Sequence, residues 1–476
     1  MAERYDLIVV GTGFASSFFL KKALESRGPS FRVLVLERGA HRTHAWQLAH
    51  RAELEKSSRA LFRNRTPRKT WWPLICFGGA SNAWFGVTPR FLPEDFRLHA
   101  LYGRGVDWPI GYDDLERYYT EAENIMAVAG PSERSPFPRS GPYPQPAHNM
   151  TDPEHLLARA HPDAFFSQPC ARPRQATKNR PACCTSGVCS LCPIDSKFTV
   201  LNELATIYQD ARVTLLLEAE ARSVDLAGGR ARGVIYAVRG VEQCALGDLV
   251  ALGANALFNP FLLLRSGLTH PWLGAGLHEQ VSVRVDVLLD GVDSFQGSTA
   301  TTGHGYMLYR GERRKKKAAA LLETWNVPVL RREPGRARQR MIVKAIFEDL
   351  PQDINRVFAS PHDPDFPIVT FQRHSDYAML AVRDLAQDID GALRGLPIER
   401  IDVDRGVIES EGHILGTTRM GRDPRESVVD GDGVHHEVRN LVVLGGSLFP
   451  TGSPANPTLT ISALALRSAD RLFGRA

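Results

Sequence analysis

The chain has 476 residues, of which 43% are hydrophobic and 23% are charged. These proportions are typical of a globular protein and exclude a disordered chain, a coiled coil or a collagen-like fibre. The length predicts two or more structural lobes. The formal net charge of +5 is too small to predict nucleic acid as the main partner. No apolar run reaches the ~18 uninterrupted residues that a membrane span needs.

The start of the chain predicts a βαβ unit. Residues 5–10 form an apolar run of the kind that makes a parallel strand buried on both faces. A glycine turn follows, then a helix over residues 15–26 and a second strand over residues 32–37. Gly11 allows the tight turn, and Gly13 lets backbone N–H groups approach a pyrophosphate at the helix N-terminus. The unit therefore predicts a dinucleotide-binding site.

Two side chains refine this prediction. Glu37 ends the second strand, where its carboxylate would bind ribose hydroxyls and repel a 2′-phosphate, which leaves NAD or FAD as the ligand. Ser16 stands where a third glycine or alanine is usual. We therefore expect the helix to lie slightly farther from the strand than in other dinucleotide-binding units.

Strands of the same kind recur late in the chain. Residues 249–256 and 440–447 each form an apolar run that ends in small residues, and the helices predicted over residues 258–265 and 459–473 follow them. Strands of one sheet are thus scattered along the chain, which predicts a discontinuous dinucleotide-binding domain with a second domain inserted. Period-two alternation, as in residues 281–287, predicts that the second domain holds an antiparallel sheet with one solvent-exposed face.

The N-terminus lacks the basic region, apolar core and cleavage site of a secretory signal peptide. The sequence therefore predicts a cytoplasmic protein, with export together with a partner subunit as the alternative.

Cysteines gather in one short loop. Four of the seven lie within ten residues, at Cys183, Cys184, Cys189 and Cys192, and Pro193 follows the last of them. Thiolates suit iron–sulfur clusters and zinc, and a proline after the last cysteine recurs in cluster-binding runs. From the residues alone, an iron–sulfur cluster, structural zinc and free or disulfide-linked thiols all stay open.

Two later motifs suit a flavin. Residues 77–86 read FGGASNAWFG, a run of small residues that can lie flat against a ring system. In the C-terminal region, HILGTTRMG begins at His413, SVVD at Ser427 and NPTLTI at Asn456. Pro457 suits the first turn of the following helix, whose N-terminus would point at whatever precedes it. Such a helix end stabilises negative charge, as on one edge of a reduced flavin.

Together these motifs resemble the glucose–methanol–choline (GMC) family of FAD-dependent oxidoreductases, and within it most closely the bacterial sugar dehydrogenases and pyranose-oxidase-like members. The resemblance spans nearly the whole chain. It implies an α/β fold (α+β overall), in which an antiparallel-sheet substrate-binding domain is inserted into a discontinuous Rossmann-like FAD-binding domain. The implied FAD-binding domain comprises residues 1–92, 206–275 and 405–476, and the implied substrate-binding domain comprises residues 93–205 and 276–404 with a Cys-rich loop at 183–192.

The resemblance also assigns roles to residues. It implies that His413 is the catalytic base and Asn456 its partner in the oxidation of a secondary or anomeric hydroxyl of a sugar, glycoside or polyol, with hydride transfer to flavin N5. The electrons would pass to an acceptor other than NAD. Some relatives attach the flavin covalently to a histidine where this chain has Ala83, so we expect noncovalent FAD. His304 and His374 are candidates for substrate contact. The implied cofactor-binding residues are Gly11, Gly13, Phe14, Ala15, Glu37, Arg38, Gly79, Ser81, Asn82, Ala83, Trp84, Gly253, Ala254, Gly446, Ser447, Pro457 and Thr458.

The cysteine loop resembles the iron–sulfur segment of bacterial FAD-dependent glucose and fructose dehydrogenases. That resemblance implies a [3Fe-4S] cluster at Cys183, Cys184, Cys189 and Cys192. The last gap is one residue shorter than in those relatives, so zinc and free thiols stay as alternatives. A cluster would deliver electrons to an electron-accepting or small partner subunit, whereas a chain without one would use oxygen or a quinone. An oxygen-using oxidase, a redox-silent lyase and an electron-relay subunit are the alternative functions.

Overall fold

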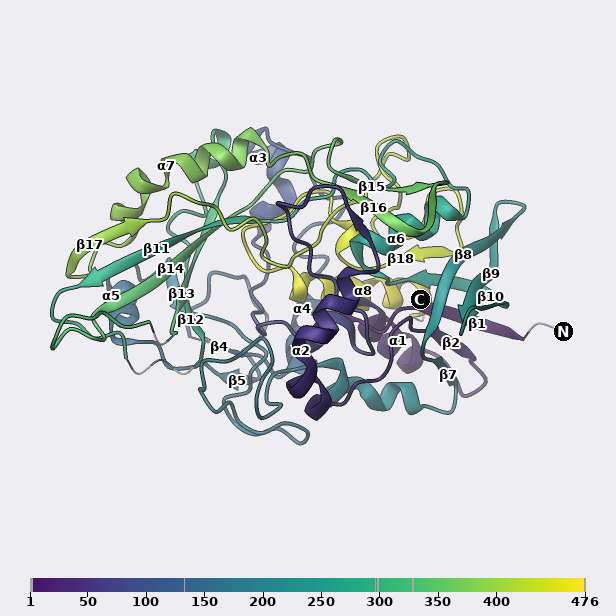
Figure 1. The fold of residues 1–476 in the computed structure, drawn as a ribbon, viewed down its shortest axis with the longest axis horizontal. Coiled ribbons are helices and arrows are strands. Elements are labelled where there is room, and N and C mark those ends of the chain that lie inside the picture. Colours follow the sequence, from purple (N-terminus) through teal and green to yellow (C-terminus); the bar gives the residue numbers. More distant parts are fainter. Residues whose placement is uncertain (1–2, 132, 296, 298, 328, 475–476) are drawn as a thin grey trace.

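The computed structural model describes residues 3–131, 133–295, 297, 299–327 and 329–474. Two large sheets lie toward opposite ends of the molecule, with helices and irregular segments between them (Figure 1). Within these residues, no helix is both long enough and apolar enough to cross a membrane.

The first sheet contains the four strands that the sequence predicts for a dinucleotide-binding domain, which are β1 (Arg4–Val10), β2 (Val33–Leu36), the end of β10 (Val241–Leu252) and β18 (Leu441–Val443). It also contains three strands that were not predicted from the sequence, which are β7 (Val213–Leu216), β8 (Ala219–Ala227) and β9 (Arg230–Val238). The parallel part has the order β7-β2-β1-β10, and β18 also pairs with β10. The first half of β10 pairs instead with β9, and β9 with β8, in an antiparallel extension. Segments from both ends of the chain thus share one sheet, as their apolar runs predict.

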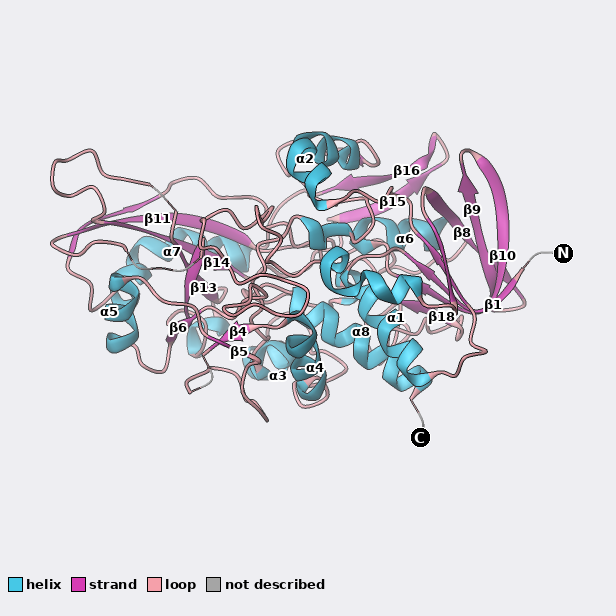
Figure 2. Ribbon diagram, turned by 90° about the horizontal axis from the view of Figure 1, so that it is seen from below, coloured by secondary structure: helices cyan, strands magenta, loops and turns pink. Residues whose placement is uncertain are grey.

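Helices pack beside this sheet. Helix α1 (Phe14–Ser26) and helix α8 (Thr458–Phe473) lie side by side in both views (Figures 1 and 2), and the rings of Phe19 and Phe473 meet edge to face at 5.8 Å. Helix α6 (Asn255–Arg265) packs near β8. Every residue of β2 and β18 is buried, which is why these strands are continuous apolar runs rather than alternating ones.

The second sheet is antiparallel throughout. Its strands are β17 (Ile398–Val403), β11 (Val281–Leu289), β14 (Arg340–Phe347), β13 (Ala320–Trp325), β12 (Thr301–Gly305) and β6 (Phe165–Ser167), in that spatial order. Odd-numbered residues of β11 from Val281 to Leu289 pack into a core with helix α7 (Asp376–Ala392). On the other face Arg284 and Asp286 are partly exposed, as the alternation predicts, but Ser282 is fully buried. That end of the face is covered because it packs against the loop that holds the candidate active site.

Smaller elements connect the two sheets. They are α2 (His44–Arg59), β3 (Arg63–Asn64), α3 (Leu98–Tyr102), α4 (Glu116–Met126), β4 (Ala129–Gly130), β5 (Gln145–Pro146), α5 (Asp152–Ala160), β15 (Arg356–Ser360) and β16 (Asp363–Thr370), with short 3-10 turns. Strands β15, β16 and β3 form a three-stranded sheet. Side chains between Phe96 and Val128 join the core of the first sheet. The domain boundary at residue 93 therefore stays a prediction.

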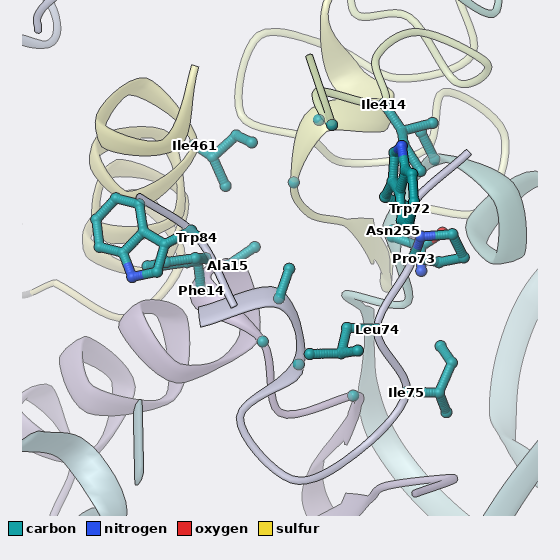
Figure 3. Close-up of a pocket in the computed structure, with 18 of the residues that line it drawn as sticks. Phe14, Ala15, Trp72, Pro73, Leu74, Ile75, Trp84, Asn255, Ile414 and Ile461 are labelled. Carbon is teal, nitrogen blue, oxygen red and sulfur yellow. The ribbon is translucent and has the colours of Figure 1, made fainter. Parts of the chain in front are cut away.

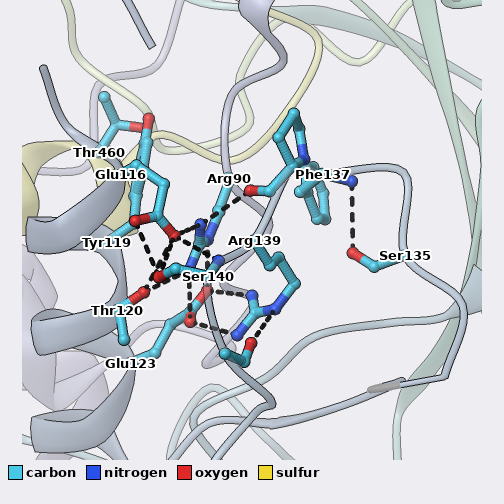
Figure 4. A network of polar contacts seen from close by, with 12 residues as sticks. Arg90, Glu116, Tyr119, Thr120, Glu123, Ser135, Phe137, Arg139, Ser140 and Thr460 are labelled. Carbon is cyan, nitrogen blue, oxygen red and sulfur yellow. Dashed lines mark hydrogen bonds and ion pairs between the residues drawn. The ribbon is translucent and has the colours of Figure 1, made fainter. Parts of the chain in front are cut away.

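A buried ionic network fixes α4 in place (Figure 4). Arg90 is fully buried and donates to both carboxylate oxygens of Glu123, at 2.8 and 2.9 Å, and Arg139 pairs with the same carboxylate at 2.8 Å. The Tyr119 hydroxyl lies 2.9 Å from the Thr460 hydroxyl, which ties α4 to the first turn of α8. Removing one partner of such a buried pair costs about 3–5 kcal/mol because a charge is left uncompensated. The network thus holds the start of α8, where the candidate active site lies.

Candidate active site

A cavity of about 560 Å³ opens where the parallel strands of the first sheet end. Val10, Leu36, Gly253 and Leu444 line it, and each lies at or just after the carboxyl end of one of these strands. Figure 3 shows apolar side chains from several parts of the chain around this space, among them Phe14, Leu74, Trp84, Ile414 and Ile461. Cavities of this size and position are typical of cofactor and substrate sites in open α/β sheets.

The turn between β1 and α1 is as tight as the sequence predicts. Gly11 has a φ of +91°, and a Cβ on it would lie 2.7 Å from the carbonyl oxygen of Gly253. Ser16 is fully buried, and its hydroxyl donates to the carbonyl of Val10 at 3.2 Å. The room for this side chain comes from Gly253, where a Cβ would lie 2.0 Å from Ser16 Oγ. The helix therefore stays within hydrogen-bonding distance of β1, and the neighbouring strand end provides the space.

Glu37 lies in the wall of the cavity, held by three hydrogen bonds. One carboxylate oxygen accepts from the backbone N–H of Thr12 at 3.0 Å and from its hydroxyl at 2.6 Å, and the other accepts from Gly39 N–H at 2.7 Å. Burial raises the pKa of Glu37 to about 7. Its neighbour Arg38 also lines the cavity and pairs with Glu220 at 2.8 Å. These contacts fix the carboxylate that is predicted to bind ribose.

The second glycine-rich segment lies directly against the first. A Cβ on Gly79 would be 3.2 Å from Gly13 Cα, and Gly78 N–H donates to the Thr12 hydroxyl at 2.9 Å. Ala83 and Trp84 line the cavity.

Three of the predicted cofactor-binding residues lie behind the cavity wall instead of lining it. The Ser81 hydroxyl accepts from Val200 N–H at 3.0 Å, and the Asn82 amide donates to two carbonyls of its own loop. The Ser447 hydroxyl accepts from the Asn259 amide at 2.9 Å. In the structure these side chains hold the loops in shape. Of the predicted set, Gly11, Gly13, Phe14, Ala15, Glu37, Arg38, Gly79, Ala83, Trp84, Gly253, Ala254, Gly446, Pro457 and Thr458 line the cavity.

His413 and Asn456 also line this cavity. The backbone N–H of His413 donates to Glu279 at 2.9 Å, and Nδ1 of its ring lies 3.0 Å from Gln280 Oε1. Burial lowers the pKa of His413 to about 4, so the imidazole is neutral at neutral pH. Asn456 Oδ1 is buried and has no hydrogen-bond donor among the described residues. Because α8 begins two residues later, its unpaired N–H groups and the positive end of its dipole lie beside this amide.

The second sheet contributes charged and aromatic groups that no motif indicates. Glu323 and Trp325 of β13 and Lys344 of β14 line the cavity, and Glu323 and Lys344 are cross-strand neighbours. Lys344 pairs with Glu411 at 2.7 Å, and Ser282 donates to the same carboxylate. Residues two apart on a strand share a face, so Glu323 and Trp325 could have been recognised as a pair from the alternation of β13. Their position at the cavity depends on the register of the sheet.

The two other candidate histidines do not line the cavity. His304 is fully buried, and its Nε2 lies 3.4 Å from Glu323. His374 lies between Asp349, at 2.7 Å, and Glu409, at 3.0 Å. Burial opposes the charged form of His374, but these two hydrogen bonds outweigh it and raise its pKa to about 9. Within the described structure neither ring is placed to touch a substrate.

The Cys-rich loop packs beside the cavity and contributes Ser190 to its wall. Lys197 donates to the carbonyls of Trp84, at 2.6 Å, and Ser190, at 2.8 Å, so the loop is tied to the second glycine-rich segment. Cys189 accepts a hydrogen bond from buried Arg172 at 3.0 Å. Cys189 and Cys192 are buried, Cys183 is half-buried and Cys184 is exposed. Over the described parts of the chain, no group of three or more Cys, His, Asp or Glu side chains is arranged to hold a metal ion. The predicted cluster therefore has no preformed ligand set.

Known proteins share both sequence and fold with this chain. Residues 371–465 match the family model for the C-terminal part of GMC oxidoreductases. The fructose dehydrogenase large subunit of Gluconobacter japonicus is 25% identical over 98% of this chain and 97% of its own length. Paromamine 6′-oxidase of Streptomyces fradiae is 27% identical over 99% and 91%. Pyridoxine 4-oxidase from Mesorbium loti, a solved structure, superposes with a TM-score of 0.68 at 17% identity, over 99% of this chain and all of that one, which shows a shared fold. Residues 371–465 match the C-terminal domain of GMC oxidoreductases, and nearly the whole chain is similar to proteins such as the fructose dehydrogenase large subunit.

Proposed function

We propose that the chain oxidises a hydroxyl group of a sugar, glycoside or polyol, with FAD held in the cavity. The observation that carries the proposal is the convergence of three features on one cavity at the carboxyl ends of parallel strands: a neutral His413, the N-terminus of α8, and an Asn456 amide oxygen with no donor among the described residues. Bound FAD supplies the acceptor for the hydride of the carbinol carbon.

The residues present fit this cofactor. Two glycine turns with no side chains, at Gly11–Gly13 and Gly78–Gly79, let backbone approach a diphosphate and a flat ring. Glu37 is fixed at the wall where it can accept from ribose hydroxyls. Asn456 Oδ1 lacks a donor within the described part of the chain, and a bound molecule can supply one. Ala83 has no nucleophilic atom, which supports noncovalent binding.

His413 would accept the hydroxyl proton of the substrate. Because burial holds its pKa near 4, the ring is in the basic form throughout the neutral range. The Asn456 amide would orient the substrate oxygen toward His413, and the start of α8 would stabilise negative charge beside it. Phe85 and Trp325, whose ring centroids lie 5.5 Å apart, form an apolar part of the cavity wall.

The cavity wall also supports a hydroxyl-rich substrate. Glu323 and Glu411 offer carboxylate oxygens that accept from hydroxyl groups, and Trp325 beside them offers an apolar face. Lys344 neutralises Glu411 through their ion pair. Glu323 keeps its negative charge, because the hydrogen bond with His304 and nearby cations lower the pKa of Glu323 more than burial raises it. A rigid ring that carries several hydroxyls matches this combination.

The electron acceptor is proposed to be a molecule other than NAD, either a small oxidant or a partner subunit. Relatives named as dehydrogenases and as oxidases are both similar to this chain, so an oxygen-using oxidase is the second candidate. No electron-transfer step is assigned to the four cysteines, because the described residues do not arrange them as metal ligands. A [3Fe-4S] cluster there stays a prediction from the sequence.

The test is anaerobic reduction of the bound flavin by a panel of sugars and polyols, followed by its absorbance. At least one compound should bleach the flavin, and His413→Ala should slow bleaching by ~10²–10⁴-fold while FAD stays bound. His436→Ala is the matched control, because His436 lies outside the cavity and bonds to Ser427. No bleaching by any compound, or a His413→Ala rate within a few fold of wild type, would contradict the proposal.

A further inference from the structure

Gln280 lies just before β11, behind His413, and is 1% exposed. One end of its amide lies 2.7 Å from the carbonyl oxygen of Ser453 and 3.1 Å from that of Ala455. The other end lies 3.0 Å from Nδ1 of His413. The amide thus touches both the ring of His413 and the segment that leads into Asn456.

Chemistry fixes which way this amide points. The two backbone carbonyls only accept hydrogen bonds, so the amide end that faces both of them must be the NH₂ group. The oxygen of Gln280 therefore faces His413, and an amide oxygen only accepts. A stable contact at 3.0 Å requires Nδ1 of His413 to carry a hydrogen. A neutral imidazole carries one hydrogen, so Nε2 is left bare.

The burial of His413 makes this argument apply at neutral pH, because the ring is then uncharged. Several charged groups surround it. Glu279 accepts from its backbone N–H and is neutralised by Lys69, and Glu411, two residues earlier in the chain, is paired with Lys344. Glu323, from β13, is the remaining carboxylate on this side of the cavity. Each of these carboxylates has a partner of its own, and Nδ1 contacts the Gln280 oxygen.

We propose that Gln280 is a positioning residue that fixes the tautomer of His413 with a bare Nε2 and ties its ring to the segment carrying Asn456. The inference rests on the proposed function for its consequence, since a bare Nε2 is the form that can take the substrate proton. The proton then moves from the substrate oxygen to Nε2, which leaves an imidazolium whose Nδ1–H is still accepted by Gln280. The same contact serves the ring before and after proton transfer.

The direct test is NMR of the protein labelled with ¹⁵N-histidine, at neutral pH, with long-range couplings used to assign the protonated nitrogen. His413 is identified by its absence from the His413→Asn spectrum. The wild-type ring should be protonated at Nδ1. In Gln280→Met, which keeps the length of the side chain but lacks a strong acceptor, the Nε2-protonated form should appear. A wild-type ring protonated at Nε2, or an unchanged tautomer in Gln280→Met, would overturn the inference.

Kinetics separate positioning from a purely structural role. Gln280→Met should slow flavin reduction by at least tenfold, and by no more than the ~10²–10⁴-fold that positioned proton transfer contributes. In the His413→Ala background the same change should cause no further loss, because the base is already absent. A further loss in that background would show a structural role and overturn the inference. Gln339→Met is the control and should react as wild type, because Gln339 lies just before β14, does not line the cavity and accepts from Gly291 N–H. If no substrate reduces the flavin, the proposed function fails while the NMR result still decides the tautomer.

Discussion

The contact between Ser16 and Gly253 is a test of how the dinucleotide-binding turn is packed. Gly253→Ala would place a Cβ 2.0 Å from Ser16 Oγ, 3.2 Å from Ser16 Cβ and 3.3 Å from the carbonyl oxygen of Val10. Real Cβ atoms do not approach other atoms at 2.0 Å, so the Ser16 hydroxyl must turn away. Its hydrogen bond to Val10 is lost when it does so.

The expected cost has two parts. A buried neutral hydrogen bond contributes about 0.5–1.5 kcal/mol, and forcing an extra methyl group into a packed site costs about 1–3 kcal/mol. Gly253→Ala should therefore lower the free energy of unfolding by roughly 2–4 kcal/mol. Ser16→Gly removes both clashing atoms at the cost of the same hydrogen bond and about 0.5–1 kcal/mol for glycine in a helix. The double variant should thus be more stable than Gly253→Ala alone by about 1–2 kcal/mol.

Equilibrium urea unfolding followed by far-ultraviolet circular dichroism measures the three variants as a double-mutant cycle. Gly391→Ala in α7 is the control, because a Cβ there meets no atom within 4 Å, and it should keep or slightly raise the stability. The packing argument for this turn is refuted if Gly253→Ala is as stable as wild type. It is also refuted if the stability lost in the double variant equals the sum of the losses in Gly253→Ala and Ser16→Gly.

Two further predictions follow from the cavity. Acid precipitation should release FAD into the supernatant, since Ala83 offers no group for covalent attachment; flavin that stays with the pellet would disprove noncovalent binding. The rate of flavin reduction should stay constant from pH 7 down to about 5 and fall near pH 4. The reason is that the pKa of His413 in the folded protein is lowered to about 4, so the ring loses its basic form only as the pH falls through that value. Loss of rate near pH 6.5 in a pH-jump measurement, with folding checked separately, would contradict the burial argument.

The parallel sheet was predictable because its signals are local. Strands β2 and β18 are continuous apolar runs, and burial on both faces requires that pattern whatever the rest of the chain does. The partnership of His413 and Asn456 came from the family resemblance, and the structure places both at one cavity. The effect of Ser16 was not predictable, because the compensating residue, Gly253, follows a different strand far along the chain.

The substrate side of the cavity was missed for a related reason. Glu323 and Lys344 are ordinary charged residues in the sequence, and they become neighbours only through the register of β13 and β14. Gln280 likewise gains its role from three contacts to distant residues. Alternation along a strand shows which residues share a face, but it does not show which face another domain covers. A single sequence therefore reveals the cofactor motifs better than the groups that select a substrate.

The two sheets line the cavity with different kinds of groups. The first sheet contributes mainly backbone and small residues to the cavity, and these fit a cofactor through shape and N–H groups. The second sheet contributes side chains such as Glu323, Trp325 and Lys344, and no backbone turn of the first sheet depends on them. Substitutions on this face of β13 and β14 can therefore alter which hydroxyl compound fits while leaving the glycine turns intact. His413 lies between the two sets, held by Glu279 and Gln280 just before β11, so the proposed base is positioned by the same sheet that lines the proposed substrate side.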